Sequence, residues 1–353
     1  MTRMNTSDNP LKILKGSDLP AFLKAMSERY ELWVPHIMGD GARFLPYHGD
    51  RPIDLDQTPP AHSAKSILLP NPEVLFRYGR NENGKISLTP PQGDGRDLVA
   101  FGMRSCDVRA IAALDAVFLN RSRPDAYYQD RRERLCVVGV GCVTPADTCF
   151  CDRMGGGSFD ETGMDVMLIP LAGAYALKIL TDRGRSILKP FQSLFGEETE
   201  ALQKEMRLII TKGKSRKSGA TVDFDALKQS IETARNDPYW ETLASICLGC
   251  GICTFVCPVC SCFSITDVGK LRGGRRIRTW DSCMFPTFTK EASGHNPRGE
   301  IVQRVKQRFL HKFYYSLENG EPPGCVGCGR CVAQCPTAID IRGIINHFQM
   351  EEP

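Results

Sequence analysis

The last third of the chain contains two copies of one cysteine motif, Cys247-Leu-Gly-Cys250-Gly-Ile-Cys253-Thr-Phe-Val-Cys257-Pro258 and Cys325-Val-Gly-Cys328-Gly-Arg-Cys331-Val-Ala-Gln-Cys335-Pro336. Both copies have the spacing C-x2-C-x2-C-x3-C-P. In this spacing three thiolates bind one iron-sulfur cubane, and the fourth cysteine binds the other. The two motifs therefore predict two 4Fe-4S clusters and a chain that carries electrons.

Crosswise ligation divides the eight cysteines into two sets. We expect Cys247, Cys250, Cys253 and Cys335 to hold cluster 1, and Cys325, Cys328, Cys331 and Cys257 to hold cluster 2. The alternative is structural zinc, which usually takes two C-x2-C pairs from separate knuckles. Three cysteines at steps of three favour iron and sulfur, and the proline after the last cysteine suits a new helix start.

A long segment of 67 residues separates the two motifs. It includes residues 299–317, where apolar residues recur at nearly the helical period. Ahead of the first motif, Asp223 and Asp237-Pro238 are typical helix starts. These features resemble the all-helical dicluster ferredoxin domain, which we expect over residues 222–353.

The front of the chain predicts an α/β domain over residues 1–215. Residues 98–103 and 135–140 are short apolar stretches typical of buried strands, and 107–119 has one apolar helical face. A right-handed crossover would make the two strands of this βαβ unit parallel. Ligands gather at the carboxyl ends of parallel strands, so that edge is a candidate site.

Four further cysteines follow these two strands. Cys106 comes after the first strand, Cys142 after the second, and Cys149 and Cys151 a few residues later. Together they form a candidate third 4Fe-4S site, and the glycines of residues 154–157 would let backbone N–H groups approach its sulfurs. The alternative is that these thiols are buried as small hydrophobic groups.

Four cysteines remain outside these three sets. Cys136 lies inside the second strand, and we expect it in the core. Cys260, Cys262 and Cys283 follow the first motif and lack an obvious fourth ligand. We expect them to pack beside the clusters, while an additional metal or substrate site is the alternative.

Composition excludes several classes of protein. Hydrophobic residues make up 42% and charged residues 24%, which is ordinary for a globular protein. No apolar run suits a signal peptide or a membrane span. The net charge of +4 counts thiols as neutral, whereas each cluster with its thiolates carries roughly −2, so little basicity remains to attract nucleic acid. We expect the basic stretches 212–217 and 270–278 to be solvated loops.

Cofactor motifs other than the cysteines are missing from the sequence. It contains no P-loop and no G-x-G-x-x-G, so no nicotinamide or flavin site is predicted within this chain. Its 16 cysteines are clustered and follow no leader, which predicts metal ligation in a reducing cytoplasm rather than disulfides.

Six phrases carry a family resemblance. They are Met103-Arg-Ser-Cys106-Asp-Val-Arg-Ala110, Gly141-Cys142 through Thr148-Cys149-Phe-Cys151, Cys257-Pro-Val-Cys-Ser-Cys-Phe263, Trp280-Asp-Ser-Cys283, Gly294-His-Asn-Pro-Arg298 and Cys325-Val-Gly-Cys-Gly-Arg-Cys331. Together they resemble the iron-sulfur β subunit family of cytosolic NAD(P)-linked nickel-iron hydrogenases, the sulfhydrogenases. That family includes an iron-sulfur subunit of anaerobic sulfite reductase and one of flavin oxidoreductase modules tied to heterodisulfide reductase.

The resemblance implies an electron-transfer subunit without its own catalytic site. Such a subunit relays electrons between a catalytic partner of the hydrogenase, sulfite reductase or heterodisulfide reductase type and a separate FAD- and NAD(P)H-binding reductase subunit. The surplus of cysteines leaves a second hypothesis open, in which the chain itself performs sulfur or disulfide chemistry at Cys260, Cys262 and Cys283. A zinc-stabilised binding module is the third hypothesis.

Overall fold

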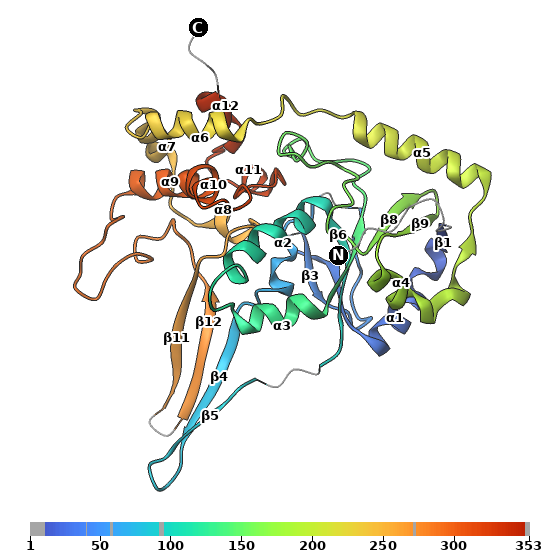
Figure 1. The fold of residues 1–353 in the computed structure, drawn as a ribbon, viewed down its shortest axis with the longest axis horizontal. Coiled ribbons are helices and arrows are strands. Elements are labelled where there is room, and N and C mark those ends of the chain that lie inside the picture. Colours follow the sequence, from blue (N-terminus) through green and yellow to red (C-terminus); the bar gives the residue numbers. More distant parts are fainter. Residues whose placement is uncertain (1–10, 40, 57–58, 92–94, 271–272, 350–353) are drawn as a thin grey trace.

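The computed structural model describes residues 11–39, 41–56, 59–91, 95–270 and 273–349. A large sheet with its helices occupies one side of the molecule, a group of helices from the C-terminal region occupies the other, and a β-arm projects from between them (Figure 1). Residues 1–10 of the predicted first domain and residues 350–353 of the predicted second domain lie outside the described residues. No described helix is long and apolar enough to cross a membrane.

The large sheet has eight strands in the order β10-β1-β9-β8-β7-β6-β2-β3. Its strands are β1 (Lys12–Lys15), β2 (Glu31–Met38), β3 (Gly41–Pro46), β6 (Leu98–Arg104), β7 (Leu135–Val140), β8 (Val166–Leu171), β9 (Ala174–Ile179) and β10 (Gly196–Glu197). Strands β2, β6, β7 and β8 are parallel neighbours, and every residue of β6 and β7 is buried. Burial on both faces is typical of parallel strands, and the predicted βαβ unit is confirmed.

Helices cover both faces of this sheet. They are α1 (Leu19–Arg29), α2 (Ser105–Phe118), α3 (Ala126–Arg134), α4 (Asp182–Leu188) and α5 (Glu200–Ser215). Alternate residues of β6 point to opposite faces, so Ala100 joins the apolar layer of α2 while Phe101 joins that of α1. Helix α3 was not predicted; its N-cap Asp125 accepts a hydrogen bond from the backbone N–H of Tyr128.

The C-terminal region is mainly helical. Its helices are α6 (Phe224–Thr233), α7 (Tyr239–Ile246), α8 (Ile252–Phe255), α9 (Ile301–Leu310), a π-helix (His311–Tyr315), α10 (Ser316–Glu318), α11 (Arg330–Ala333) and α12 (Ile341–Gln349). Asp223 caps α6 as predicted, since its side chain accepts from two backbone N–H groups. The core contains Trp240, Phe309, Phe313 and Phe348.

The region between the cysteine motifs also contains a β-hairpin, which sequence analysis did not predict. Strands β11 (Phe263–Lys270) and β12 (Gly273–Trp280) pair with β4 (Glu73–Arg80) and β5 (Ile86–Thr89) in the order β11-β12-β4-β5. The prediction of an all-helical domain over residues 222–353 is therefore wrong at this hairpin. The strand β4, with which the hairpin pairs, lies far away in the sequence. Most of β11 is exposed, so β11 has no buried face that a regular alternation of apolar and polar residues would reveal.

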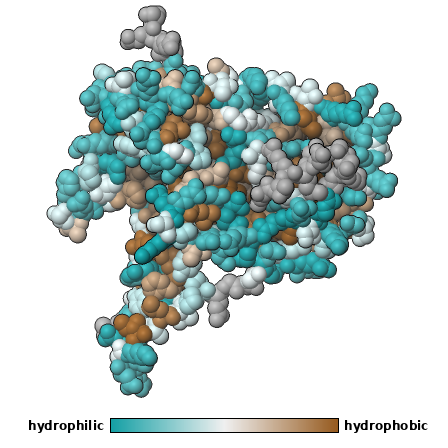
Figure 2. All heavy atoms as spheres, in the orientation of Figure 1, coloured by the Kyte–Doolittle hydropathy of each residue, from teal (hydrophilic) through white to brown (hydrophobic). Residues whose placement is uncertain are grey.

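This four-stranded sheet forms the projecting arm. The basic stretch 270–278, expected to be a solvated loop, runs from the end of β11 through most of β12. Several large apolar side chains of the arm are exposed, namely Ile86, Leu88, Ile265 and Val268. Figure 2 shows apolar surface on the arm as it leaves the body. The other basic stretch, 212–217, was also expected to be a solvated loop, but its residues up to Ser215 belong to helix α5.

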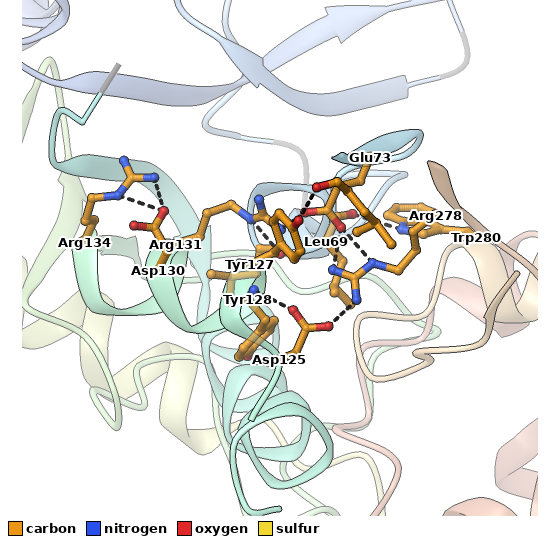
Figure 3. A network of polar contacts seen from close by, with 12 residues as sticks. Leu69, Glu73, Asp125, Tyr127, Tyr128, Asp130, Arg131, Arg134, Arg278 and Trp280 are labelled. Atoms are coloured by element: carbon orange, nitrogen blue, oxygen red, sulfur yellow. Dashed lines mark hydrogen bonds and ion pairs between the residues drawn. The ribbon is translucent and has the colours of Figure 1, made fainter. Parts of the chain in front are cut away.

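A buried charge network attaches the arm to the α/β layer (Figure 3). Arg278 of β12 is 3% exposed and forms ion pairs with Glu73 of β4 and Asp125 at the start of α3. Glu73 also pairs with Arg131 of α3. Trp280 adds a hydrogen bond from its indole N–H to the carbonyl oxygen of Leu69 (2.9 Å). The base of the arm is thus held by largely desolvated charges rather than by apolar packing alone.

We expect Arg278→Gln to lower the free energy of unfolding by about 3–5 kcal/mol, because it leaves buried carboxylates without their guanidinium partner. Arg276→Gln on the same strand is the matched control. Its ion pair with Asp267 is exposed to solvent, and little change is expected. Anaerobic thermal and urea unfolding of both variants measures the difference, and equal stabilities would contradict the anchoring role of Arg278.

Candidate iron-sulfur centres

The first predicted ligand set surrounds one cavity. Its wall includes Cys247, Cys250, Cys253 and Cys335, together with Cys331 of the second set. Helix α7 ends directly before Cys247, and the short helix α8 carries Cys253. Gly249 and Gly251 have φ values of +64° and +76°, which allow the tight curl that turns these thiols to one side. The fourth cysteine arrives from the second motif, as crosswise ligation requires.

The second predicted ligand set is brought together in the same way. Burial raises the pKa of the Cys325, Cys328 and Cys331 thiols, and the nearby Cys257 thiol raises each of them further. Cys257 of the first motif therefore lies close to all three thiols of the second. Gly327 and Gly329, at φ +67° and +73°, repeat the backbone curl of the first motif.

Backbone N–H groups point at several of these sulfurs. Gly249 donates to Cys247 Sγ (3.4 Å), Gly327 to Cys325 Sγ (3.5 Å) and Ile339 to Cys335 Sγ (3.3 Å). Such bonds favour the thiolate form that ligates iron. The all-thiol donor sets fit iron-sulfur clusters.

A single ion would require a different arrangement of donors. In the described part of the chain, no three His, Cys, Asp or Glu side chains are arranged to hold one metal ion. The thiolates of a cubane need not meet in this way, because each binds a different iron.

The candidate third set converges at the predicted sheet edge. Cys106 begins α2 after β6, and Cys142 follows β7. Burial raises the pKa of the Cys106 thiol, and the nearby Cys142 thiol adds to the shift. Burial likewise raises the pKa of Cys151 to about 12, with further contributions from the Cys142 and Cys149 thiols. All four cysteines of the set are thus neighbours, and Cys136 is fully buried in the core as expected.

One detail of that third site differs from the prediction. The N–H groups of Met154 and Gly156 both donate to the carbonyl oxygen of Cys151, at 3.1 and 2.9 Å. They are therefore not available to cluster sulfurs. Arg109 of α2 holds the same loop by donating to the carbonyl oxygens of Gly155 (2.7 Å) and Met154 (3.0 Å).

The third set lies directly against the second motif. A Cβ atom on Gly327 would come within 2.5 Å of the Phe150 carbonyl oxygen, and one on Gly329 within 2.4 Å of the Thr148 carbonyl oxygen. The backbone N–H of Phe150 donates to the Gly327 carbonyl (2.8 Å). Only glycine permits this approach, so the two glycines both shape the motif and seat it against the cysteines of the front domain.

A buried ion pair completes this contact. Arg330, between Cys328 and Cys331, donates two hydrogen bonds to the carboxylate of Asp107, at 2.9 and 2.6 Å. Both side chains are 1% exposed. Sequence analysis missed this pair, although Asp107 directly follows Cys106 within one of the family phrases.

Comparisons with known proteins identify the type of domain that contains the two cysteine motifs. Residues 246–339 match the 4Fe-4S dicluster domain family. The beta subunit of sulfhydrogenase 2 from Pyrococcus furiosus is 30% identical over 328 residues, which cover 93% of this chain and 95% of the relative. This chain belongs to the sulfhydrogenase beta subunit family. It therefore carries a dicluster domain, which implies two 4Fe-4S clusters. No solved structure matches the chain significantly.

In this family member, two buried cations flank the dicluster thiols. Arg308 is 6% exposed and lies near Cys253 and Cys331, one thiol from each motif. Its Nε atom has no hydrogen-bond partner among the described residues. Lys312 is 5% exposed, and its Nζ atom lies 3.4 Å from Cys257 Sγ. Buried cations require anionic partners, which deprotonated cysteines supply.

The two cations lie one helical turn apart on the same segment. Like charges at this spacing repel each other, so neighbouring negative charge must hold them in place. Lys312 lies within the π-helix His311–Tyr315, an element often found at functional sites. Sequence analysis missed both residues. The available clue was two basic residues beside the apolar face of Val305, Phe309 and Phe313.

The surplus cysteines near the first motif line a separate cavity. Its wall includes Cys260, Cys262 and Cys283 together with Arg308 and Lys312. Cys283 also belongs to the buried apolar core and Cys262 packs against it, beside several cluster thiols, as was expected. A larger cavity of about 640 Å³ opens beside Cys149 and Cys151 of the candidate third set.

We expect Lys312→Gln to lower the reduction potential of one of the two clusters, because the reduced cluster carries more negative charge and loses a nearby cation. A shift of about 60 mV corresponds to a tenfold change in a one-electron equilibrium. Redox titration followed by electron paramagnetic resonance measures it. Lys24→Gln on the exposed face of α1 is the control, and an unshifted potential in Lys312→Gln would argue against the assigned contact.

Proposed function

We propose that this chain is the electron-relay subunit of a multi-subunit cytoplasmic oxidoreductase. In this proposal it carries electrons between a catalytic partner of the hydrogenase, sulfite reductase or heterodisulfide reductase type and a FAD- and NAD(P)H-binding reductase subunit. Cys247, Cys250, Cys253 and Cys335 hold cluster 1; Cys325, Cys328, Cys331 and Cys257 hold cluster 2; Cys106, Cys142, Cys149 and Cys151 hold cluster 3. When bound, the clusters supply one-electron transfer.

The observation that carries the proposal is the unbroken succession of the three thiol sets. Arg308 lies near thiols of both the first and the second set, and Cys106 of the third set packs in one buried cluster with Cys328 of the second. Cys149 Sγ is 3.7 Å from the carbonyl oxygen of Cys328. Closely spaced ligand sets would place consecutive clusters near one another, which is what an electron relay needs.

The two ends of the proposed relay are open to solvent. Cys250 of the first set is exposed, beside Leu248, whose side chain is also exposed. At the other end, the cavity lined by Cys149 and Cys151 reaches the surface. These openings support electron exchange with two different partner subunits. The relative's name, subunit beta, supports membership of an assembly.

We expect the anaerobically purified chain to contain about twelve irons, since three 4Fe-4S clusters hold four each. Cys149→Ala and Cys335→Ala should each lose about four irons, from different clusters. Cys136→Ala, a buried cysteine outside all three sets, is the control and should keep them all. About eight irons in the unchanged chain would rule out cluster 3, and zinc without iron would refute the proposal.

We expect the native complex, purified through a tag on this chain, to reduce its catalytic partner with NAD(P)H. Cys149→Ala and Cys335→Ala should each stop this electron flow, while the reductase subunit still reduces an artificial dye. The control Cys136→Ala should leave both activities unchanged. Electron flow that survives the loss of clusters 1 and 3 would show that the relay bypasses this chain.

A further inference from the structure

Cys262 and Cys283 flank the base of the β11–β12 hairpin, because Cys262 directly precedes β11 and Cys283 follows the end of β12 by three residues. Phe263 pairs with Trp280 at the end of the ladder, and the N–H of Asp281 donates to the carbonyl oxygen of Cys262 (2.9 Å). Both thiols line the same surface groove and the same inner cavity. The pairing of the two strands therefore brings the two ends of the hairpin, and with them these cysteines, close together.

This pair is reachable from solvent and also from the clusters. An open groove of about 350 Å³ is lined by both thiols together with Arg298 and His311. On the inner side, both thiols share a cavity with Cys260. Lys312 Nζ lies 3.4 Å from Sγ of Cys257, a proposed ligand of cluster 2, and 3.6 Å from Sγ of Cys260. The surplus thiols thus lie between a proposed cluster ligand and the surface groove.

Cations lie around the inner cavity. Lys312 Nζ lies 3.6 Å from Cys260 Sγ, and Lys65 Nζ donates to the carbonyl oxygen of Cys260 (3.1 Å). Arg308 lines the same inner cavity. Nearby positive charge favours thiolates, which are the nucleophiles of thiol-disulfide exchange.

We propose that Cys262 and Cys283 form a redox-active dithiol that exchanges two electrons with a disulfide ligand in the groove. The Cys262 thiolate attacks one sulfur of the ligand R–S–S–R, forming a mixed disulfide and releasing RS⁻. Cys283 then gives up its proton and attacks Cys262, which forms the Cys262–Cys283 disulfide and releases the second RS⁻. Two electrons from the clusters and two protons restore the dithiol.

The individual environments of the two thiols suit these roles. The neighbouring Cys283 is the main cause that lowers the pKa of Cys262 to about 7, while burial opposes it. Cys283 is 9% exposed and Cys262 is more accessible. Cys262 is therefore the attacking thiol and Cys283 the resolving one. Arg298 at the groove favours ligands that carry carboxylate groups, so oxidised glutathione is a suitable probe.

The first test measures the thiols directly. The full-length holoprotein is poised anaerobically at a series of potentials, alkylated and digested for mass spectrometry. We expect a Cys262–Cys283 disulfide that appears and disappears with a two-electron slope. Alkylation of both cysteines at every potential would overturn the proposal.

The second test separates a dithiol from a cluster ligand. Cys283→Ser should keep the iron content and cluster spectra of the unchanged chain, and should trap a mixed disulfide at Cys262 when oxidised glutathione is added. Cys262→Ser should trap none at Cys283, and Cys136→Ala should react as the unchanged chain does. If Cys283→Ser folds poorly, Cys283→Ala replaces it.

Loss of about four irons from Cys283→Ser or Cys283→Ala would identify Cys283 as a cluster ligand and overturn the dithiol. Absence of trapping at Cys262 would overturn the exchange step. The proposal rests on the ligand sets proposed above only for its electron source. Iron content tests the proposed ligand sets, whereas alkylation tests the proposed dithiol. The two proposals can therefore fail independently, and the two measurements show which one has failed.

Discussion

The ion pair between Arg330 and Asp107 is the contact on which the arrangement of the thiols depends. Arg330 belongs to the second cysteine motif, and Asp107 follows Cys106 of the front domain. Both side chains are 1% exposed, and the guanidinium also donates to the carbonyl oxygen of Pro60 (2.7 Å). A bidentate pair has a fixed geometry, and separating it would leave two uncompensated buried charges. The ion pair therefore fixes the position of the front cysteines relative to the second cysteine motif.

Charge balance explains the buried basic residues around the dicluster thiols. Arg308, Lys312 and Lys65 are each at most 6% exposed, a position that lysine and arginine rarely occupy without partners. The thiols around them provide those partners once they are deprotonated. The same charges favour electrons on nearby clusters and thiolate at nearby free cysteines. Ligation, redox potential and thiol reactivity are thus linked through one set of buried cations.

The β11–β12 hairpin connects the arm to this chemistry. At its outer part it pairs with β4, and Arg278 attaches it to α3 through Asp125. Its base is flanked by Cys262, directly before β11, and Cys283, shortly after β12. A movement of the arm would therefore be transmitted to these thiols along the antiparallel ladder, since hydrogen-bonded strands move together.

The sequence by itself determined the cofactor chemistry, because cysteine spacing within each motif is a local property that fixes which thiols can bind one cubane. It also predicted the βαβ unit, since the alternation of apolar strand and amphipathic helix is local too. Only the tertiary structure decided the rest. The hairpin, the Arg330–Asp107 pair, the cations Arg308 and Lys312, and the meeting of Cys262 with Cys283 all depend on contacts between distant segments. Such contacts follow from packing in three dimensions, and no spacing along the chain records them.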